Sequence, residues 1–221
     1  MMHPGSGALV IMGISPRLSS HDDELRTAHE DAARKASMYN GVWATVESIQ
    51  NIGAGFFDYY VASETRVEYD QNLGPYMARL SYDPKKDVSR NQDGALFVRF
   101  TYPAAFPGNI RYNFGKNSDG SPEWTTRQPT EISGYAAGVG RSGRLSSFNN
   151  TVLKAYEAAA ANIASRVSNE LRAVDTMVQS SAESQIHSFS SGRLRNFLVL
   201  EIWIDPSTRA VWTLAVAQPQ D

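Results

Sequence analysis

The sequence carries one pattern twice, at a constant separation of 127 residues. Ten residues between positions 13 and 33 are identical to residues between 140 and 160, and the run Arg-Leu-Ser-Ser recurs unbroken. Internal repetition of this kind indicates repeated structural units, each of which forms a similar supersecondary structure. The matched residues of the first copy are Gly13, Ser15, Arg17, Leu18, Ser19, Ser20, Ala28, Glu30, Ala32 and Ala33.

The end of each copy also looks alike. Residues 77–84 and 199–206 are strand-like runs that finish in Asp-Pro, and a second apolar segment follows each of them. Proline fixes φ and aspartate bonds the backbone two residues on, so Asp-Pro between two such runs favours a turn. We therefore expect each unit to close with a β-hairpin, with a short loop at 205–209 and a longer one at 83–94.

Each copy has a helical pattern after its Arg-Leu-Ser-Ser turn. Apolar residues recur at three- and four-residue spacing from Leu25 to Val46, and from Val152 to Met177, which is typical of an amphipathic helix. We expect Asp22 or Asp23 to cap the first helix and Asn149 or Asn150 the second. The second helix is predicted to span about 150–180, roughly 45 Å at 1.5 Å per residue.

These patterns predict an α+β fold built as a tandem duplication of a β-α-β-β unit. Each unit is expected to pack a long amphipathic helix on a small, mainly antiparallel sheet. The first unit covers residues 7–103 and the second 131–221, with 104–130 as the linker. Between helix and hairpin the first copy has an alternating, strand-like run at 61–69, whereas the second has only the polar stretch 180–192.

Composition excludes several classes of protein. The net charge is −2 and no basic stretch occurs, which argues against nucleic-acid binding. The chain has no cysteine, so it forms no disulfide, thiolate nucleophile or cysteine metal site. No apolar run approaches the roughly 18 to 20 residues of a membrane span.

Two motifs resemble chemistry but fit a structural role better. Gly138, Gly140 and Gly143 match the G-x-G-x-x-G dinucleotide fingerprint, yet only the middle glycine recurs in the first copy, as Gly13. The acidic cluster around His21 and His29 lacks the second histidine, four residues on, that a zincin helix requires. We expect a strand-to-helix turn and a solvated helix start, with no cofactor, no metal and no catalytic residue.

Two further sets of residues are candidates for a role. Glu30 and Glu157 recur in both copies, as do Arg17 and Arg144, and we interpret them as structural residues that anchor the turn or lie on the helix surface. The aromatic insert that holds Phe56, Phe57, Tyr59 and Tyr60 has no counterpart in the second copy. Surface aromatics favour protein contacts, so this insert is the candidate protein-contact surface, unless the rings pack on their own domain.

Residues 122–217 resemble a known family. The resemblance rests on Pro-Glu-Trp at 122–124, the strand ending Tyr-Ala-Ala-Gly-Val-Gly at 135–140, the alanine-rich helix 155–168 and the hairpin 201–217. These segments are similar to the Lpp-twenty outer-membrane lipoprotein family, which is related to the N-terminal domain of the flagellar T-ring protein FlgT. The resemblance extends more faintly to 7–103 through the repeat.

The resemblance implies a non-enzymatic bacterial cell-envelope protein that acts in interaction or assembly, in a flagellar or outer-membrane setting. Its partners would be envelope proteins or further copies of itself, in the periplasm or at the outer membrane. Members are often lipid-anchored through an N-terminal cysteine, so membrane attachment here is expected only through an anchor upstream of Met1, after a removed signal peptide. The alternative is a periplasmic small-ligand-binding module with a cleft between the two repeats; a nucleotide-dependent enzyme ranks third.

Overall fold

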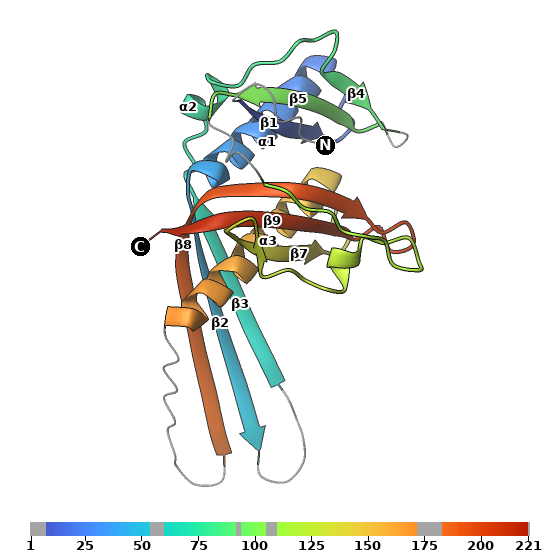
Figure 1. Ribbon diagram of the computed structural model, residues 1–221. Coiled ribbons are helices and arrows are strands. Elements are labelled where there is room, and N and C mark those ends of the chain that lie inside the picture. Colours follow the sequence, from blue (N-terminus) through green and yellow to red (C-terminus); the bar gives the residue numbers. More distant parts are fainter. Residues whose placement is uncertain (1–7, 54–59, 92–93, 105–109, 172–182, 221) are drawn as a thin grey trace.

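A computed structural model describes residues 8–53, 60–91, 94–104, 110–171 and 183–220, with the side chains of 47–53, 60–64, 168–171 and 183–190 left out. Its fold is mixed α+β, with two antiparallel sheets and three α-helices among the described residues, and the predicted class is confirmed at this level (Figure 1). None of these helices combines the length and apolar character that crossing a membrane requires.

The upper body is a three-stranded sheet covered by a helix. β1 (Leu9–Ser15), β5 (Leu96–Tyr102) and β4 (Val88–Arg90) lie in the order β1-β5-β4, and α1 (His21–Asn40) packs on them (Figure 1). The short helix α2 (Gly74–Met77) lies beside α1. Alternate residues of β5 are buried, which is the pattern of a strand with one face in the core.

The lower body is built on one end of a six-stranded sheet. The sheet has the order β3-β2-β8-β9-β7-β6, and α3 (Phe148–Leu171) packs on one face of it. We define the lower body as β6 (Glu131–Ile132), β7 (Tyr135–Ser142), α3, β9 (Val211–Gln220) and the second half of β8 (Glu183–Ile204). A one-turn 3-10 helix, η1 (Glu123–Thr125), places Trp124 in the core.

An arm of three long strands extends from the two bodies. It consists of β2 (Val42–Gly53), β3 (Tyr60–Tyr69) and residues 183–192 of β8. β2 lies in the middle and is antiparallel to both neighbours, so β3 and β8 run in the same direction (Figure 1). β8 changes partner along its length, pairing with β2 up to Leu194 and with β9 from Arg193 onward.

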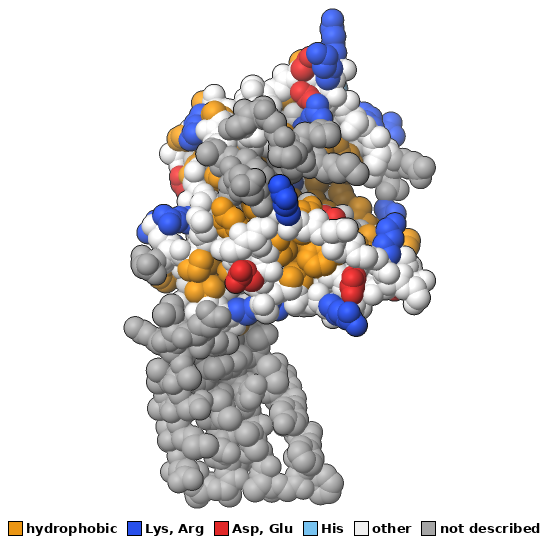
Figure 2. All heavy atoms as spheres, viewed as in Figure 1, with side chains coloured by type: hydrophobic (Ala, Val, Ile, Leu, Met, Phe, Trp, Pro, Cys, Tyr) orange, Lys and Arg blue, Asp and Glu red, His pale blue; other side chains and the backbone are white. Residues whose placement is uncertain are grey.

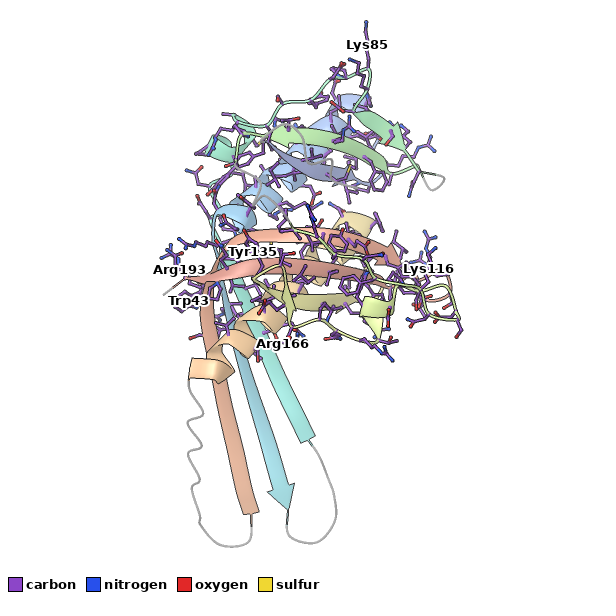
Figure 3. All side chains as sticks on the ribbon, viewed as in Figure 1. Trp43, Lys85, Lys116, Tyr135, Arg166 and Arg193 are labelled. Atoms are coloured by element: carbon purple, nitrogen blue, oxygen red, sulfur yellow. The ribbon has the colours of Figure 1, made fainter. Side chains whose placement is uncertain are left out.

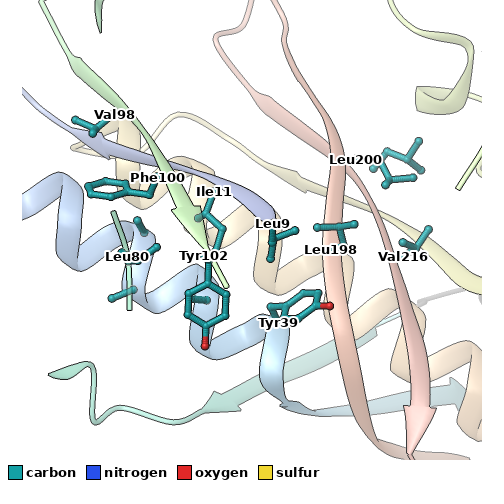
Figure 4. Close-up of a cluster of buried hydrophobic side chains, with 14 of the residues drawn as sticks. Leu9, Ile11, Tyr39, Leu80, Val98, Phe100, Tyr102, Leu198, Leu200 and Val216 are labelled. Carbon is teal, nitrogen blue, oxygen red and sulfur yellow. The ribbon is translucent and has the colours of Figure 1, made fainter. Parts of the chain in front are cut away.

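A shared hydrophobic core joins the upper and lower bodies. Leu9 of β1 and Tyr39 of α1 belong to the same buried cluster as Leu198 and Leu200 of β8. Figure 4 shows Leu9 and Tyr39 beside Leu198. Burial of these side chains is the main force that holds the two sheets against each other.

Several predicted boundaries were wrong, and the reasons are physical. The first helix ends at Asn40, and Trp43 and Val46 belong to β2, where Val42 and Ala44 are buried and Trp43 is 46% exposed. This alternation has the strand period of two, which a short apolar run cannot distinguish from a helix face. Residues 77–83 form no strand, and only Ser81 bridges to Thr101.

Other predictions fell nearer to the structure. Residues 183–192, read as a polar stretch without a strand, form the first part of β8. The run 131–139, which is strand-like in sequence, is divided between β6 and β7, which pair as a tight hairpin. The predicted strand at 61–69 is confirmed as β3, and the predicted turn after Asp205 is confirmed between β8 and β9. The second helix begins at Phe148, and the part of the prediction covering 172–180 lies outside the described residues.

Two glycines let each helix lie against its strand. A side chain at Gly13 would collide with the backbone carbonyl of Ala28, and one at Gly140 with the carbonyl of Ala155. Both carbonyls belong to a helix backbone, which cannot move aside as a flexible side chain does. The small residues of strand and helix therefore set the distance between α1 and β1 and between α3 and β7.

We expect Gly13→Ala and Gly140→Ala each to lower the free energy of unfolding by about 2 kcal/mol, because overpacking forces the helix away from its strand. Gly143→Ala is the matched control, since a methyl group there meets no atom within 4 Å, and its effect is expected to stay within about 0.5 kcal/mol. Urea unfolding of the three variants measures this. Equal losses at Gly140 and Gly143 would contradict the packing argument.

Candidate functional site

The candidate site is a concave region that we call the inter-body cleft. It has a volume of about 610 Å³ and lies between β1 of the upper body and β8 of the lower body. Figure 2 shows hydrophobic side chains in the recess that separates the two bodies. β1 contributes Leu9–Met12 and Ile14, and β8 contributes every residue from Phe197 to Ile204. Successive residues of a strand face opposite sides of its sheet, so lining by consecutive residues means that the cleft follows the strand edges.

The edge of β1 is partly closed by a buried ion pair. Lys35 and Asp31 lie one turn apart on α1 with Nζ and Oδ2 2.6 Å apart, and their side chains are 5% and 2% exposed. Lys35 also donates to the carbonyl of Met12 at 2.8 Å, and the Ile14 N–H donates to Asp31 at 2.9 Å. The pair thus supplies one donor and one acceptor to the free side of β1, as a neighbouring strand would.

Aromatic side chains from β5 and α3 also line the inter-body cleft. Phe97 of β5 meets Phe148 of α3 with ring centroids 6.1 Å apart, and Lys35 Nζ lies 5.3 Å from the ring centroid of Tyr156. Burial raises the pKa of the Tyr156 phenol, and the negative charge of Asp31 raises it further. Tyr156 is therefore a neutral phenol at physiological pH, which leaves it unsuited to act as a base.

The opposite wall of the inter-body cleft has its own hydrogen bonds. Trp124 donates its indole N–H to Glu201, and Tyr112 donates its hydroxyl to the carbonyl of Leu200 at 3.2 Å. Together with Lys35–Asp31, these bonds engage both charged side chains that line the cleft, Lys35 and Glu201. The cleft therefore has an apolar, electrically balanced lining without converging free acids or bases.

The strongly perturbed carboxylates lie elsewhere and hold turns. Hydrogen bonds from Arg90 and from the Leu18 N–H lower the pKa of Glu24 to about 2. Hydrogen bonds from Thr208 and Ser207 hold the pKa of Asp205 well below its usual range, in the β8–β9 turn. Within the described residues, no group of three metal-ligating side chains comes together.

The recurring residues of the two copies occupy exposed or half-buried places. Arg17 and Arg144 are exposed, while Glu30 and Glu157 are half-buried on α1 and α3. Glu157 bonds Lys154 at 2.6 Å, and no bond to either arginine is present in the described structure. Among the described contacts, neither glutamate is therefore bonded to the arginine that recurs with it.

Other residues anchor the turns in place of Glu30 and Glu157. Glu24 accepts from the Leu18 N–H at 3.0 Å, and Thr151 accepts from the Leu145 N–H at 3.1 Å. Sequence reasoning missed this pair because the two residues are not identical, although both stand four residues after the second serine of the repeated turn. Each side chain supplies one acceptor oxygen at the same place, which is what the turn requires.

Three other predictions concern the aromatic insert, His29 and the cap of the first helix. Phe56, Phe57 and Tyr59 lie outside the described residues, and Tyr60 begins β3 with its side chain outside them. His29 bonds the Met77 carbonyl at 3.0 Å and stacks on Phe100, a structural role. Ser20, not Asp22 or Asp23, caps α1; it accepts from the Asp23 N–H.

The glycine motif has a packing explanation. Gly138 and Gly140 face α3, where a side chain would meet Ile163 or Ala155, and β7 pairs antiparallel with β9. A dinucleotide fingerprint needs the parallel β-α-β unit, which this strand arrangement does not provide. Searches against known proteins give no further lead: no family model, no curated protein and no solved structure matches this chain.

The Glu24–Arg90 bond should make stability depend on pH. Because the folded pKa of Glu24 is about 2 and its ordinary value is 4.5, its contribution is complete above pH 4.5 and is lost as pH falls toward 2. We expect Glu24→Gln to lower the free energy of unfolding at pH 7 and to flatten its decline between pH 4.5 and 2. Chemical unfolding across that range measures both effects. Asp23→Asn, an exposed carboxylate of the same turn, is the control, and parallel curves for wild type and Glu24→Gln would contradict the assignment.

The Asp31–Lys35 pair offers a second test with an internal control. Lys35→Met leaves a buried carboxylate without its cation, and we expect the free energy of unfolding to fall by about 3 kcal/mol. Lys154→Met breaks the exposed Lys154–Glu157 pair, which has the same 2.6 Å separation, and is expected to cost less than about 0.5 kcal/mol. Urea unfolding of both variants makes the comparison. Equal effects would show that burial does not govern the pair.

Proposed function

We propose that this chain is a non-enzymatic assembly protein of the bacterial cell envelope, and that copies of it associate through the arm. The observation that carries the proposal is that the arm has two unpaired edges. β2 is hydrogen-bonded on both sides, whereas β3, and β8 along residues 183–190, are each paired on one side alone among the described strands. Unpaired strand edges are templates for pairing with another chain.

The composition of the arm supports pairing at its edges. Residues 183–192 include four serines, and 60–69 include two glutamates and one arginine. A free-standing antiparallel sheet needs a hydrophobic face to be stable in water, and these sequences supply few large aliphatic residues. Pairing with neighbouring copies would satisfy the edge N–H and C=O groups and stabilise the arm.

The direction of the strands determines what kind of association follows. The two free edges belong to different strands that run in the same direction, so β3 of one copy can pair with β8 of the next in parallel. A contact between two different surfaces is heterologous, and it produces a ring when the rotation between copies closes. Self-association of this kind is the partner we propose.

The junction of the arm with the bodies limits the unpaired edge of β8. Trp43 of β2 lies opposite Glu68 on one side and Arg193 on the other, and Trp43 and Arg193 lie close to each other where the arm meets the bodies (Figure 3). Arg193 is also paired with Gln220 of β9, so it does not lie on the unpaired edge. The proposed contact between copies therefore involves the part of the arm beyond this junction.

We further propose that the two bodies are copies of one β-α-β-β unit. The supporting observations are the strand orders β1-β5-β4 and β7-β9-β8, and the contacts that recur at the same offset of 127 residues. The hydrogen bond from the Leu18 N–H to Glu24 corresponds to the one from the Leu145 N–H to Thr151. The close contact of the α1 backbone with Gly13 corresponds to that of the α3 backbone with Gly140. The β2–β3 hairpin falls outside the shared elements.

The envelope setting rests on the resemblance of residues 122–217 to the Lpp-twenty lipoprotein family, with an anchor upstream of Met1 as the expected link to the membrane. The alternative, a small-ligand module, is supported by the position of the inter-body cleft between the two proposed units. Its two charged side chains, Lys35 and Glu201, are already bonded to Asp31 and Trp124, which favours assembly over recognition of a charged small molecule.

The arm contact can be tested by shortening the arm, because the two unpaired edges lie along it. Sedimentation velocity over a range of protein concentrations measures the self-association of the wild-type chain and of two variants.

Lys85→Glu is the control, since Lys85 is exposed at the far end of the upper body (Figure 3). A second variant shortens the arm by replacing residues 49–62 with Asn-Gly, which keeps the Ser48–Ser63 pairing and is expected to abolish association. A wild-type chain that stays monomeric at all concentrations, or association that is unaffected by the shortened arm, would contradict the proposal.

A further inference from the structure

The two bodies turn unpaired strand edges toward the inter-body cleft. On the upper side, Met12 and Ile14 bond α1 side chains, so the even-numbered residues of β1 direct their N–H and C=O groups away from β5. The backbone hydrogen bonds of β5 agree with this orientation. Arg99 and Thr101, which lie opposite Met12 and Val10, direct their N–H groups away from β1, to the carbonyls of Asp87 and Ser81. Val10 therefore directs its N–H and C=O to the cleft side, and no described residue bonds them.

The lower side has the same character. The Asp205 N–H donates to the carbonyl of Ala210 across the β8–β9 turn. In an antiparallel pair every second residue bonds the partner strand, so Trp203 and Glu201 also direct their backbone N–H and C=O groups to β9. Ile202 and Ile204 then direct their N–H and C=O groups away from β9, into the cleft. No described residue bonds these groups, and the side chains of both isoleucines are 39% exposed.

The lining of the cleft selects what could pair with these edges. Met12, Ile202 and Ile204 supply exposed apolar surface. Lys35 is paired with Asp31, and Glu201 accepts the indole N–H of Trp124. A charged occupant would lose hydration and would find both charged lining side chains already engaged, so the occupant is uncharged. An acyl chain would match the apolar lining but would leave the N–H and C=O groups of Ile202 and Ile204 unbonded. An extended polypeptide satisfies both.

We propose that the inter-body cleft binds an uncharged, extended segment of another polypeptide, which adds a strand to the edge of β8 at Ile202 and Ile204 and contacts β1 at Val10. This is binding by β-augmentation, in which main-chain hydrogen bonds give affinity and side-chain pockets give selectivity. The Asp31–Lys35 pair occupies the C-terminal half of the β1 edge, so the segment bonds β8 over more residues than β1. The described strands of a second copy are already in sheets and do not supply such a segment.

A random heptapeptide library displayed on phage and selected against the full chain tests the proposal. We expect selection of uncharged peptides with alternating apolar residues, and binding of the synthetic peptide to weaken at least tenfold for Ile202→Pro. Proline removes the N–H that faces the cleft and takes nothing from the ladder with β9, whereas the control Ile202→Val keeps that N–H. Selection of no peptide, or equal binding by Ile202→Pro, would overturn the proposal.

Two further measurements make the outcome independent of the folding of that variant. Two methylated versions of the selected peptide are compared, one with its odd-numbered amides methylated and one with its even-numbered amides methylated. One version should lose binding and the other should keep it, because a strand presents alternate amides to one edge. On peptide binding, hydrogen exchange of the Ile202 amide should slow at least tenfold. Equal loss of binding in the two methylated series would refute strand pairing.

The same exchange measurement distinguishes the other occupants. If the Ile202 amide of the free protein is already protected and a variant lacking residues 1–7 loses that protection, the occupant is the chain's own N-terminal segment and the proposal fails. If protection rises with protein concentration, the occupant is a second copy, and the proposal fails in that case too.

Discussion

The close approach of a glycine-containing strand to an alanine-rich helix is the constraint on which the rest of the structure depends. Ala28 on α1 and Ala155 on α3 place their carbonyls where a side chain at Gly13 or Gly140 would stand. Because the helices lie so near, the turn between strand and helix must be tight. In each turn a leucine N–H donates to a side chain in the first turn of the helix, to Glu24 in the upper body and to Thr151 in the lower body. The repeated sequence is thus the sequence of this joint, and each body is built outward from it.

Charged side chains in this protein serve mainly to satisfy the main chain. Glu24 holds the Leu18 N–H, Asp205 holds the β8–β9 turn, and Asp31 with Lys35 closes half of the β1 edge. Such groups have perturbed pKa values or deep burial, the features that often mark catalytic residues, yet here each has a structural partner. Among the described residues, unpaired backbone groups at strand edges are available for contacts with other molecules, and this supports the binding and assembly that we propose.

The sequence allowed prediction of the local parts of the fold and not of the arrangement between them. The repeat predicted two strand-turn-helix joints, and Asp-Pro predicted the turn at Asp205, because both signals act over a few residues. The pairing of Val42 with Leu194 joins segments far apart in the chain, and no local pattern reports it. For the same reason the inter-body cleft could not be located: main-chain edges form it, and no residue type marks a free N–H or C=O group.

The arm and the inter-body cleft differ in origin, and this difference bears on how the protein works. The cleft lies where β1 of the upper body faces β8 of the lower body, so in the duplication that we propose it is the junction between the two copies. The arm lies outside the elements that these copies share, in the β2–β3 hairpin and the lower half of β8. Since β8 runs through both, from the edge of the arm at 183–192 to the wall of the cleft at 197–204, a bend in this one strand would alter both surfaces. The two proposed activities, association through the arm and binding in the cleft, would therefore be coupled through β8, which is one strand across Arg193 and Leu194, where it changes partner.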